Sequence, residues 1–256
     1  MTTLPFVIVL AAFGLLVGSF LNVCIYRVPR RESIVWLASR CTQCGRHLAW
    51  HENVPVLSWL VLRGRCRTCG ARISSMYPLV ELTTAVMFAA GAMAHGPSGL
   101  LAVRLVFGCA LIVLFAIDLR HRVLPDVITL PGIAIGFAAS CFLLPGWLSS
   151  LIGILAGGGM LLAIAEAYYR VRGQHGLGMG DVKMLAMIGA FLGWPLMILT
   201  LVFASFAGSI VGVALIASGR GNLQAALPFG TFLAMGAVVA AAAGDPILDW
   251  YLAFYR

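Results

Sequence analysis

Long apolar runs separated by short polar segments determine what this chain can fold into. Hydrophobic residues make up 61% of its 256 residues, charged residues make up 10%, and the mean hydropathy is +1.00. Soluble domains usually carry about 25% charged residues, because their surface must interact with water. The composition therefore excludes a soluble enzyme and a disordered chain. It predicts an all-α polytopic membrane protein.

An apolar helix needs roughly 20 residues to cross ~30 Å of hydrocarbon. Eight runs predict about eight transmembrane helices: Leu4–Tyr26, Pro78–His95, Gly99–Asp118, Val127–Leu144, Trp147–Tyr168, Val182–Trp194, Pro195–Ser218 and Thr231–Tyr251. The sixth run is short, so we expect it to be tilted, to begin earlier or to be partly re-entrant. The pattern divides the chain into a first helix (1–26), a small polar domain (27–77) and a transmembrane domain (78–256).

The basic residues predict the orientation of these helices. Of the 17 Lys and Arg residues, fifteen fall on one side of an eight-helix topology, whereas Arg104 and Arg256 belong to the other side. Loops on the cytoplasmic side carry such an excess of Lys and Arg. We therefore expect domain 27–77 in the cytoplasm and both termini on the opposite side. The net charge of +8 is then a topology signal, and we expect contact with membrane lipid and no nucleic-acid partner.

Domain 27–77 contains two C-x-x-C pairs, each followed by glycine. The four cysteines are Cys41, Cys44, Cys66 and Cys69. This pattern is typical of a zinc ribbon, in which four thiolates complete a tetrahedron. A reducing cytoplasm argues against two disulfides, and the basic flanks argue against a redox pair. His47 or His51 would be a ligand only in place of a cysteine. Since four protein ligands leave no open position, we expect a structural zinc ion.

Carboxylates in or near the spans are the second unusual feature. An ionisable side chain in a bilayer costs at least about 2.5 kcal/mol and therefore indicates a function. Asp118 ends the third run and Asp181 opens the sixth, so both are expected at the cytoplasmic edge. Two such carboxylates can share a proton and act as an acid–base pair. The equally weighted alternative is that Asp181 caps its helix and Asp118 pairs with a nearby arginine.

Asp181 belongs to Gly178-Met-Gly180-Asp181, which with Asp118 resembles the G-x-G-D intramembrane aspartyl proteases. Over nearly the whole chain the order of motifs resembles, more specifically, the bacterial type IV prepilin peptidases. The motifs are Gly18-Ser-Phe-Leu-Asn22 with Arg27 and Pro29, the double C-x-x-C loop, Tyr77-Pro-Leu-Val-Glu81, Leu124-Pro-Asp126 and Pro228-Phe-Gly230.

This resemblance implies an enzyme of the bacterial inner membrane with periplasmic termini. It would remove the basic leader of type IV prepilins or pseudopilins after a glycine, and then methylate the new N-terminal amine with S-adenosylmethionine. The resemblance places the catalytic aspartates at Asp118 and Asp181, with Asp126 as the rival to Asp118. It also matches the four cysteines to the metal-binding loop of the bifunctional members.

Two other functional classes remain open at this stage: a proton-coupled membrane transporter, and a membrane scaffold that uses the zinc ribbon to recruit a partner. Glu52 is expected to be a solvated charge, and Glu166 to pair with Arg170 or to reach the interface. Glu81 is expected to hold either a cation or a buried partner within the protein. Asn22 and Arg27 match family positions but have no role that the sequence explains.

Overall fold

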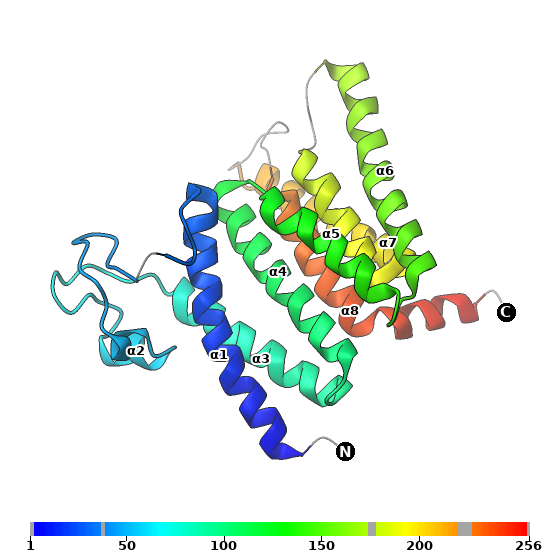
Figure 1. Ribbon diagram of the computed structural model, residues 1–256. Coiled ribbons are helices and arrows are strands. Elements are labelled where there is room, and N and C mark those ends of the chain that lie inside the picture. Colours follow the sequence, from blue (N-terminus) through cyan, green and yellow to red (C-terminus); the bar gives the residue numbers. More distant parts are fainter. Residues whose placement is uncertain (1–2, 37–38, 174–177, 220–226, 255–256) are drawn as a thin grey trace. The chain divides into compact units, whose positions relative to one another are not determined.

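The computed structural model describes residues 3–36, 39–173, 178–219 and 227–254, and these form helices joined by loops, the longest of which carry the four cysteines (Figure 1). Arg220 and Arg256, two of the charges that predict the topology, lie outside the described residues. The elements are α1 (Leu4–Arg27), η1 (Val28–Arg30), η2 (Trp50–Asn53), α2 (Leu57–Val61), α3 (Met76–His95), α4 (Gly99–His121), α5 (Asp126–Ser140), α6 (Trp147–Arg172), α7 (Met179–Ala217) and α8 (Phe229–Ala253).

Among the described residues, six helices are long and apolar enough to cross a membrane: α1, α3, α4, α6, α7 and α8. The 15-residue α5 is apolar but shorter. The predicted all-α membrane fold is confirmed, and each of the eight predicted runs falls on a helix. The sixth and seventh runs share the 39-residue α7 and the fourth run forms the short α5, so eight runs correspond to six long helices.

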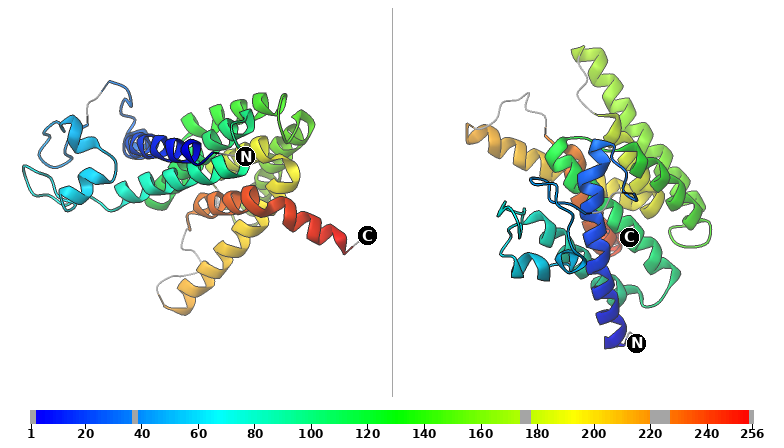
Figure 2. Two further views of the ribbon diagram at one scale, coloured as in Figure 1. Left: turned by 90° about the horizontal axis from the view of Figure 1, so that it is seen from below. Right: turned by 60° about the vertical axis from the view of Figure 1, so that its left-hand side comes forward.

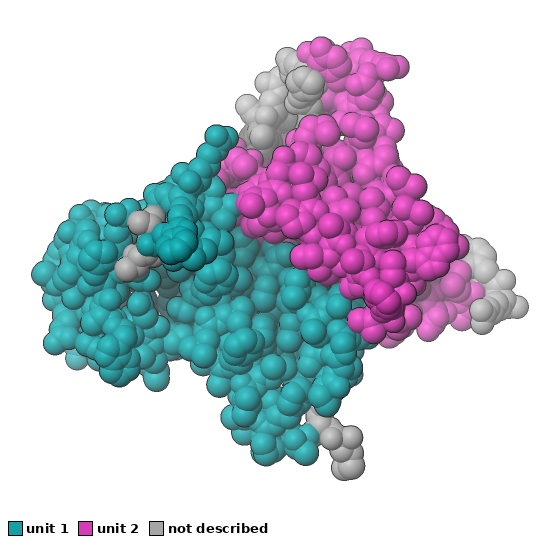
Figure 3. All heavy atoms as spheres, viewed as in Figure 1, with its two compact units in different colours: residues 1–113 teal, residues 114–256 magenta. Residues whose placement is uncertain are grey.

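The chain forms two compact units, residues 1–113 and 114–256, which Figure 3 shows in teal and magenta. In the first unit, α1 and α3 pack antiparallel through glycines. A Cβ at Gly18 would lie 2.7 Å from the Cα of Glu81, and one at Gly14 would lie 2.8 Å from the Cα of Ala85. Only residues without a Cβ allow two helix backbones to come this close, and such contacts are common between membrane helices.

In the second unit, α6 and α7 pack antiparallel at an equally short distance. A Cβ at Gly189 would meet the backbone of Gly153, and one at Gly157 would lie 2.9 Å from the carbonyl oxygen of Leu185. On another face of α7, α5 runs parallel to the first half of the helix, because Gly132 lies against Met187 and Gly136 against Phe191. The starts of α5 and α7 therefore lie at the same end of this unit.

Helix α7 is interrupted at Gly193, whose φ of 78° and ψ of 172° are not helical. Figure 2 shows its second half, in gold and orange, leaving the first half at a sharp angle. This second half runs antiparallel to α8, since Gly244 lies against Leu196 and Gly208 against Phe232. The end of α7 therefore lies beside the start of α8. Each half of α7 corresponds to one predicted run, the sixth before Gly193 and the seventh after it.

Candidate active site

Asp118 lies in the last turn of α4 and is buried, with 4% of its surface exposed. Its Oδ2 accepts two hydrogen bonds from Thr231, from the backbone N–H at 2.7 Å and from the hydroxyl at 3.0 Å. Thr231 is the third residue of α8. The first N–H groups of a helix lack partners within the helix and carry partial positive charge. The start of α8 therefore holds the Asp118 carboxylate in place.

Asp181 is the third residue of α7, and Gly178 occupies the N-cap position. The carboxylate of Asp181 accepts a hydrogen bond from the backbone N–H of Gly178, and Asp118 is close enough to interact with it electrostatically. Asp181 is therefore not the N-cap residue of α7, as the alternative reading of the sequence had it. The two carboxylates, 63 positions apart in the sequence, lie at the same end of the second unit.

The side chain of Leu124 packs against two glycines near the two aspartates. Its buried side chain lies between the starts of α7 and α8: a Cβ at Gly180 or at Gly230 would lie 2.8 Å from a carbon atom of Leu124. A Cβ at Gly230 would also lie 3.1 Å from Oδ2 of Asp118. The Leu-Pro-Asp, G-x-G-D and Pro-Phe-Gly motifs thus meet around one leucine, and the two glycines make room for it.

Asp126, the rival to Asp118, has a different environment. Both of its carboxylate oxygens accept from Nζ of Lys183, at 2.7 and 2.8 Å. The Asp126 side chain is 55% exposed and that of Lys183 30% exposed. Lys183 is the only lysine of the chain and lies two residues after Asp181. This ion pair joins the start of α5 to the start of α7.

The four cysteines of the polar domain form a compact cluster, as predicted. The sulfur atoms of Cys41, Cys44, Cys66 and Cys69 all lie within 4.8 Å of one another. The sulfurs of Cys41 and Cys69 are 3.8 Å apart, too far for a disulfide. Four sulfurs at ~2.3 Å from one zinc ion would be about 3.8 Å apart. The cluster therefore fits a tetrahedral metal ion, and within the described residues it includes neither histidine of the loop.

The backbone of each C-x-x-C turn prepares its first cysteine for metal binding. Backbone N–H groups of Cys69 and Thr68 lower the pKa of the Cys66 thiol to about 6. Those of Cys44 and Gln43 likewise lower the pKa of Cys41. The glycine after each pair closes the turn at positive φ, at 71° for Gly45 and 69° for Gly70. Since a metal binds the thiolate, these turns favour the form that coordinates it.

Two family models match the chain, and each covers one of the two candidate sites. The bacterial peptidase A24 N-terminal domain matches residues 12–95, which contain the four cysteines, and the type IV leader peptidase family matches residues 105–213, which contain both aspartates. A prepilin leader peptidase/N-methyltransferase of Pseudomonas putida is 37% identical over 94% of this chain and 92% of its own length.

The chain belongs to the type IV leader peptidase family. A relative of the same name from Aeromonas hydrophila is 37% identical over 94% of this chain and 91% of its own. Another from Myxococcus xanthus is 44% identical over 84% of this chain, but the match covers 65% of that protein's length. No solved structure matches the chain.

Several polar residues of this family member have partners that the sequence did not reveal. Asn22 donates to the carbonyl oxygen of Tyr77 at 3.0 Å, which joins the end of α1 to the start of α3. The buried Arg27 donates to the carbonyl oxygen of Ser33 at 3.0 Å. The Glu81 carboxylate accepts from the backbone N–H of Val56 at 2.7 Å. Glu81 thus has a partner within the protein, one of the two roles expected of it.

Glu166 and Glu52 each form an ion pair with an arginine. Glu166 pairs with Arg170 at 2.7 Å on the exposed surface of α6, which is one of the two roles expected of it. Glu52, in contrast, is not a solvated charge: its side chain is 3% exposed and pairs with Arg46 at 2.7 Å. Glu52 also accepts from the backbone N–H of Ala49 at 2.9 Å. The sequence could not predict this pair, because the loop contains nine arginines and any of them could have been the partner of Glu52.

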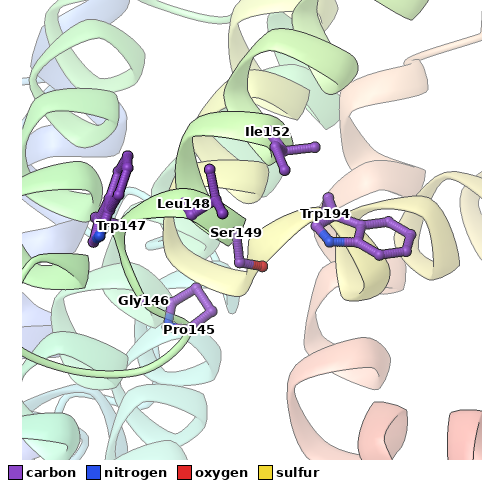
Figure 4. Close-up of a pocket in the computed structure, with 7 residues that line it drawn as sticks. All are labelled: Pro145, Gly146, Trp147, Leu148, Ser149, Ile152 and Trp194. Atoms are coloured by element: carbon purple, nitrogen blue, oxygen red, sulfur yellow. The ribbon is translucent and has the colours of Figure 1, made fainter.

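The second unit also has an open pocket of about 370 Å³, lined by residues such as Pro145, Ser149 and Trp194 (Figure 4). It lies at the interruption of α7, where Gly193 adjoins Ser149 and Pro145. Gly193 lies twelve positions after Asp181 on α7, or about 18 Å along the helix at 1.5 Å per residue. Few polar atoms line the pocket. It is therefore separate from the carboxylate pair and offers no acid or base of its own.

Proposed function

We propose that this chain removes the basic leader of type IV prepilins or pseudopilins after a glycine, and then methylates the new N-terminal amine. The observation that supports the peptidase assignment is that Asp118 and Asp181 lie at the same end of the second unit, near enough for their charges to interact. The names of the relatives support both activities, since they are prepilin leader peptidases and N-methyltransferases.

The chemistry follows from two carboxylates at close range. Two neighbouring carboxylates do not both ionise easily, so such a pair can share one proton. The ionised carboxylate takes a proton from water, whose oxygen attacks the scissile carbonyl carbon, while the protonated carboxylate donates to the carbonyl oxygen. The carbon–nitrogen bond then breaks and the leaving amine takes a proton from the pair. Thr231 fixes the orientation of the Asp118 carboxyl, because it donates two hydrogen bonds to one oxygen.

The surroundings of the pair suit a peptide substrate. Gly178 is exposed and precedes α7, so an extended peptide can approach Asp181 without meeting a side chain there. Both carboxylates lie within a turn of a helix end. An apolar substrate helix could therefore remain in the lipid while its polar scissile segment reaches the pair at the membrane edge.

The four-cysteine cluster would hold a structural zinc ion, which stabilises the domain between α1 and α3. S-adenosylmethionine would supply the methyl group, and we assign no residue to its binding. A Cys66→Ser variant should lose metal and N-methylation to a greater extent than cleavage, because the cluster and the carboxylate pair belong to different units. Intact methylation by a metal-free variant would contradict this assignment.

The orientation follows from the charges. With the four-cysteine domain in the cytoplasm, the basic loops lie on the side on which leaders are removed. The fold-back of α7 at Gly193 supports this topology, since it returns the chain to the end where Asp118 and Asp181 lie. We propose the bacterial inner membrane as the location, with both termini in the periplasm.

The alternatives account for the geometry less well. A proton-coupled transporter needs carboxylates near the middle of the bilayer, whereas these two lie near helix ends. A scaffold needs no carboxylate pair at all, and the observed pair lies outside the unit that contains the zinc-ribbon domain.

The test is mass spectrometry of a prepilin incubated with the purified protein in lipid vesicles. We expect loss of the leader after a glycine, and one added methyl group only when S-adenosylmethionine is supplied. An unprocessed prepilin would contradict the proposed peptidase activity. A cleaved but unmethylated product in the presence of the donor would contradict the second activity alone.

A further inference from the structure

One short helix of the polar domain has its apolar face turned outward. In α2, the side chains of Leu57, Leu60 and Val61 are 61%, 55% and 80% exposed. Their spacing of three and four residues places them on one face of the helix. Trp59 points elsewhere and donates its ring N–H to the carbonyl oxygen of Ile73 at 3.2 Å. The three exposed side chains therefore form an apolar face that the domain does not bury.

A hydrogen bond joins the start of α2 to the first turns of α3. Val56, the residue before α2, donates its backbone N–H to Glu81 at 2.7 Å. Glu81 is the sixth residue of the membrane-spanning α3, and a helical side chain points toward the start of its helix. Val56 has the rare φ of 61° for a β-branched residue, so this bond holds the chain in a backbone conformation it would otherwise avoid. The start of α2 is thereby held beside the first turns of α3.

Exposed arginines lie directly after this apolar face. Three arginines, Arg63, Arg65 and Arg67, follow α2 directly, and all three are exposed. The whole domain from residue 27 to 77 carries nine arginines against two acids, one of which, Glu52, already pairs with Arg46. Clusters of arginine next to a membrane helix are attracted to anionic lipid headgroups. An apolar face next to cations is the pattern of segments that lie in the headgroup region.

We propose that α2 lies in the interfacial layer of the membrane, with Leu57, Leu60 and Val61 inserted among acyl chains and the following arginines on anionic headgroups. Trp50 supports this placement, because it is 82% exposed on η2, which packs against α2. Tryptophan is enriched at membrane interfaces. The four-cysteine domain is then held against the bilayer by lipid as well as by α1 and α3. This inference does not depend on the peptidase assignment.

The test uses the full chain in vesicles that contain phosphatidylglycerol. A photoreactive p-benzoylphenylalanine replaces Leu60, and a matched variant carries it in place of Gln43, an exposed polar residue of the first C-x-x-C turn. After irradiation with prepilin present, mass spectrometry identifies what is attached. We expect phospholipid adducts at position 60 that exceed those at position 43 several-fold. A prepilin adduct at position 60, a link within the chain, or equal lipid labelling at both positions would overturn the proposal.

A second measurement needs no substitution. Amide hydrogen exchange of the wild-type chain is compared between nanodiscs of phosphatidylglycerol and of phosphatidylcholine. We expect slower exchange in the α2 segment, and not in the C-x-x-C turns, when the lipid is anionic. Exchange of α2 that is independent of lipid charge would contradict the role of the arginines. Prepilin cleavage in the same samples shows separately whether the enzyme is active, so failure of this proposal differs from failure of the proposed function.

Discussion

Thr231 donates both its backbone N–H and its hydroxyl to the same oxygen of Asp118, at 2.7 and 3.0 Å. A hydrogen bond to a charged group contributes about 1.5–3 kcal/mol. We therefore predict that Thr231→Val, which keeps the shape and loses the hydroxyl, lowers kcat/KM for prepilin cleavage about 10- to 100-fold. Thr231→Ser keeps the hydroxyl and should retain most activity. Equal losses in the two variants would show that packing, and not the hydrogen bond, is responsible.

Asp126 and Lys183 form a partly exposed ion pair at the starts of α5 and α7. Exposed ion pairs usually contribute about 0–1 kcal/mol. Asp126→Asn should therefore keep cleavage within about tenfold of the wild type. Lys183→Asp should be more harmful, because it places two carboxylates opposite each other close to Asp181.

The exchange of the two charges, Asp126→Lys with Lys183→Asp, should recover activity that the single Lys183→Asp variant has lost, as measured by the initial rate of cleavage in vesicles. This double variant separates a positioning pair from a catalytic aspartate. If Asp126 itself carried the acid–base chemistry, neither Asp126→Asn nor the exchanged pair would cleave.

Glu52 gives the metal domain a predictable pH dependence. The guanidinium of Arg46 and the backbone N–H of Ala49 lower the pKa of the Glu52 carboxyl. Its folded pKa is then below the unfolded value of about 4.3. The stabilisation is complete above that value and is lost as the pH falls through the folded pKa.

We predict that Glu52→Gln releases zinc to a chromogenic chelator faster than the wild type at neutral pH. The difference should shrink below about pH 4, where Glu52 of the wild type becomes protonated as well. Glu32→Gln, the other acid of this domain, is the matched control and should behave as the wild type does. A difference that persists unchanged in acid would contradict a role for the Glu52 charge.

The sequence predicted the helices and the metal cluster because both depend on local patterns. Apolar runs require helices in lipid, and two C-x-x-C turns require only their own backbone to present four sulfurs. The interruption of α7 also leaves a signal in the sequence. Gly193 and Pro195 lie at the boundary between the sixth and seventh runs, and the sixth run is too short for a straight span. Here the sequence pattern and the tertiary structure agree.

Contacts between residues far apart in the sequence could not be predicted. Thr231 lies 113 residues after Asp118, and Lys183 lies 57 residues after Asp126. No periodicity links such distant positions, so these partners could not be predicted from the sequence. Glu52 was misjudged for a related reason: its burial depends on how residues 46 to 52 fold back, and a charge count does not contain that information.

Asp118 and Asp181 are proposed to cleave prepilin together. The most direct test is the rate of leader removal by Asp118→Asn, Asp181→Asn and Asp126→Asn, measured by mass spectrometry in vesicles at equal amounts of folded protein. We predict losses of about 10³-fold or more for the first two variants and a rate within about tenfold of the wild type for the third. Cleavage that survives in Asp118→Asn or Asp181→Asn, or that disappears in Asp126→Asn alone, would contradict the account.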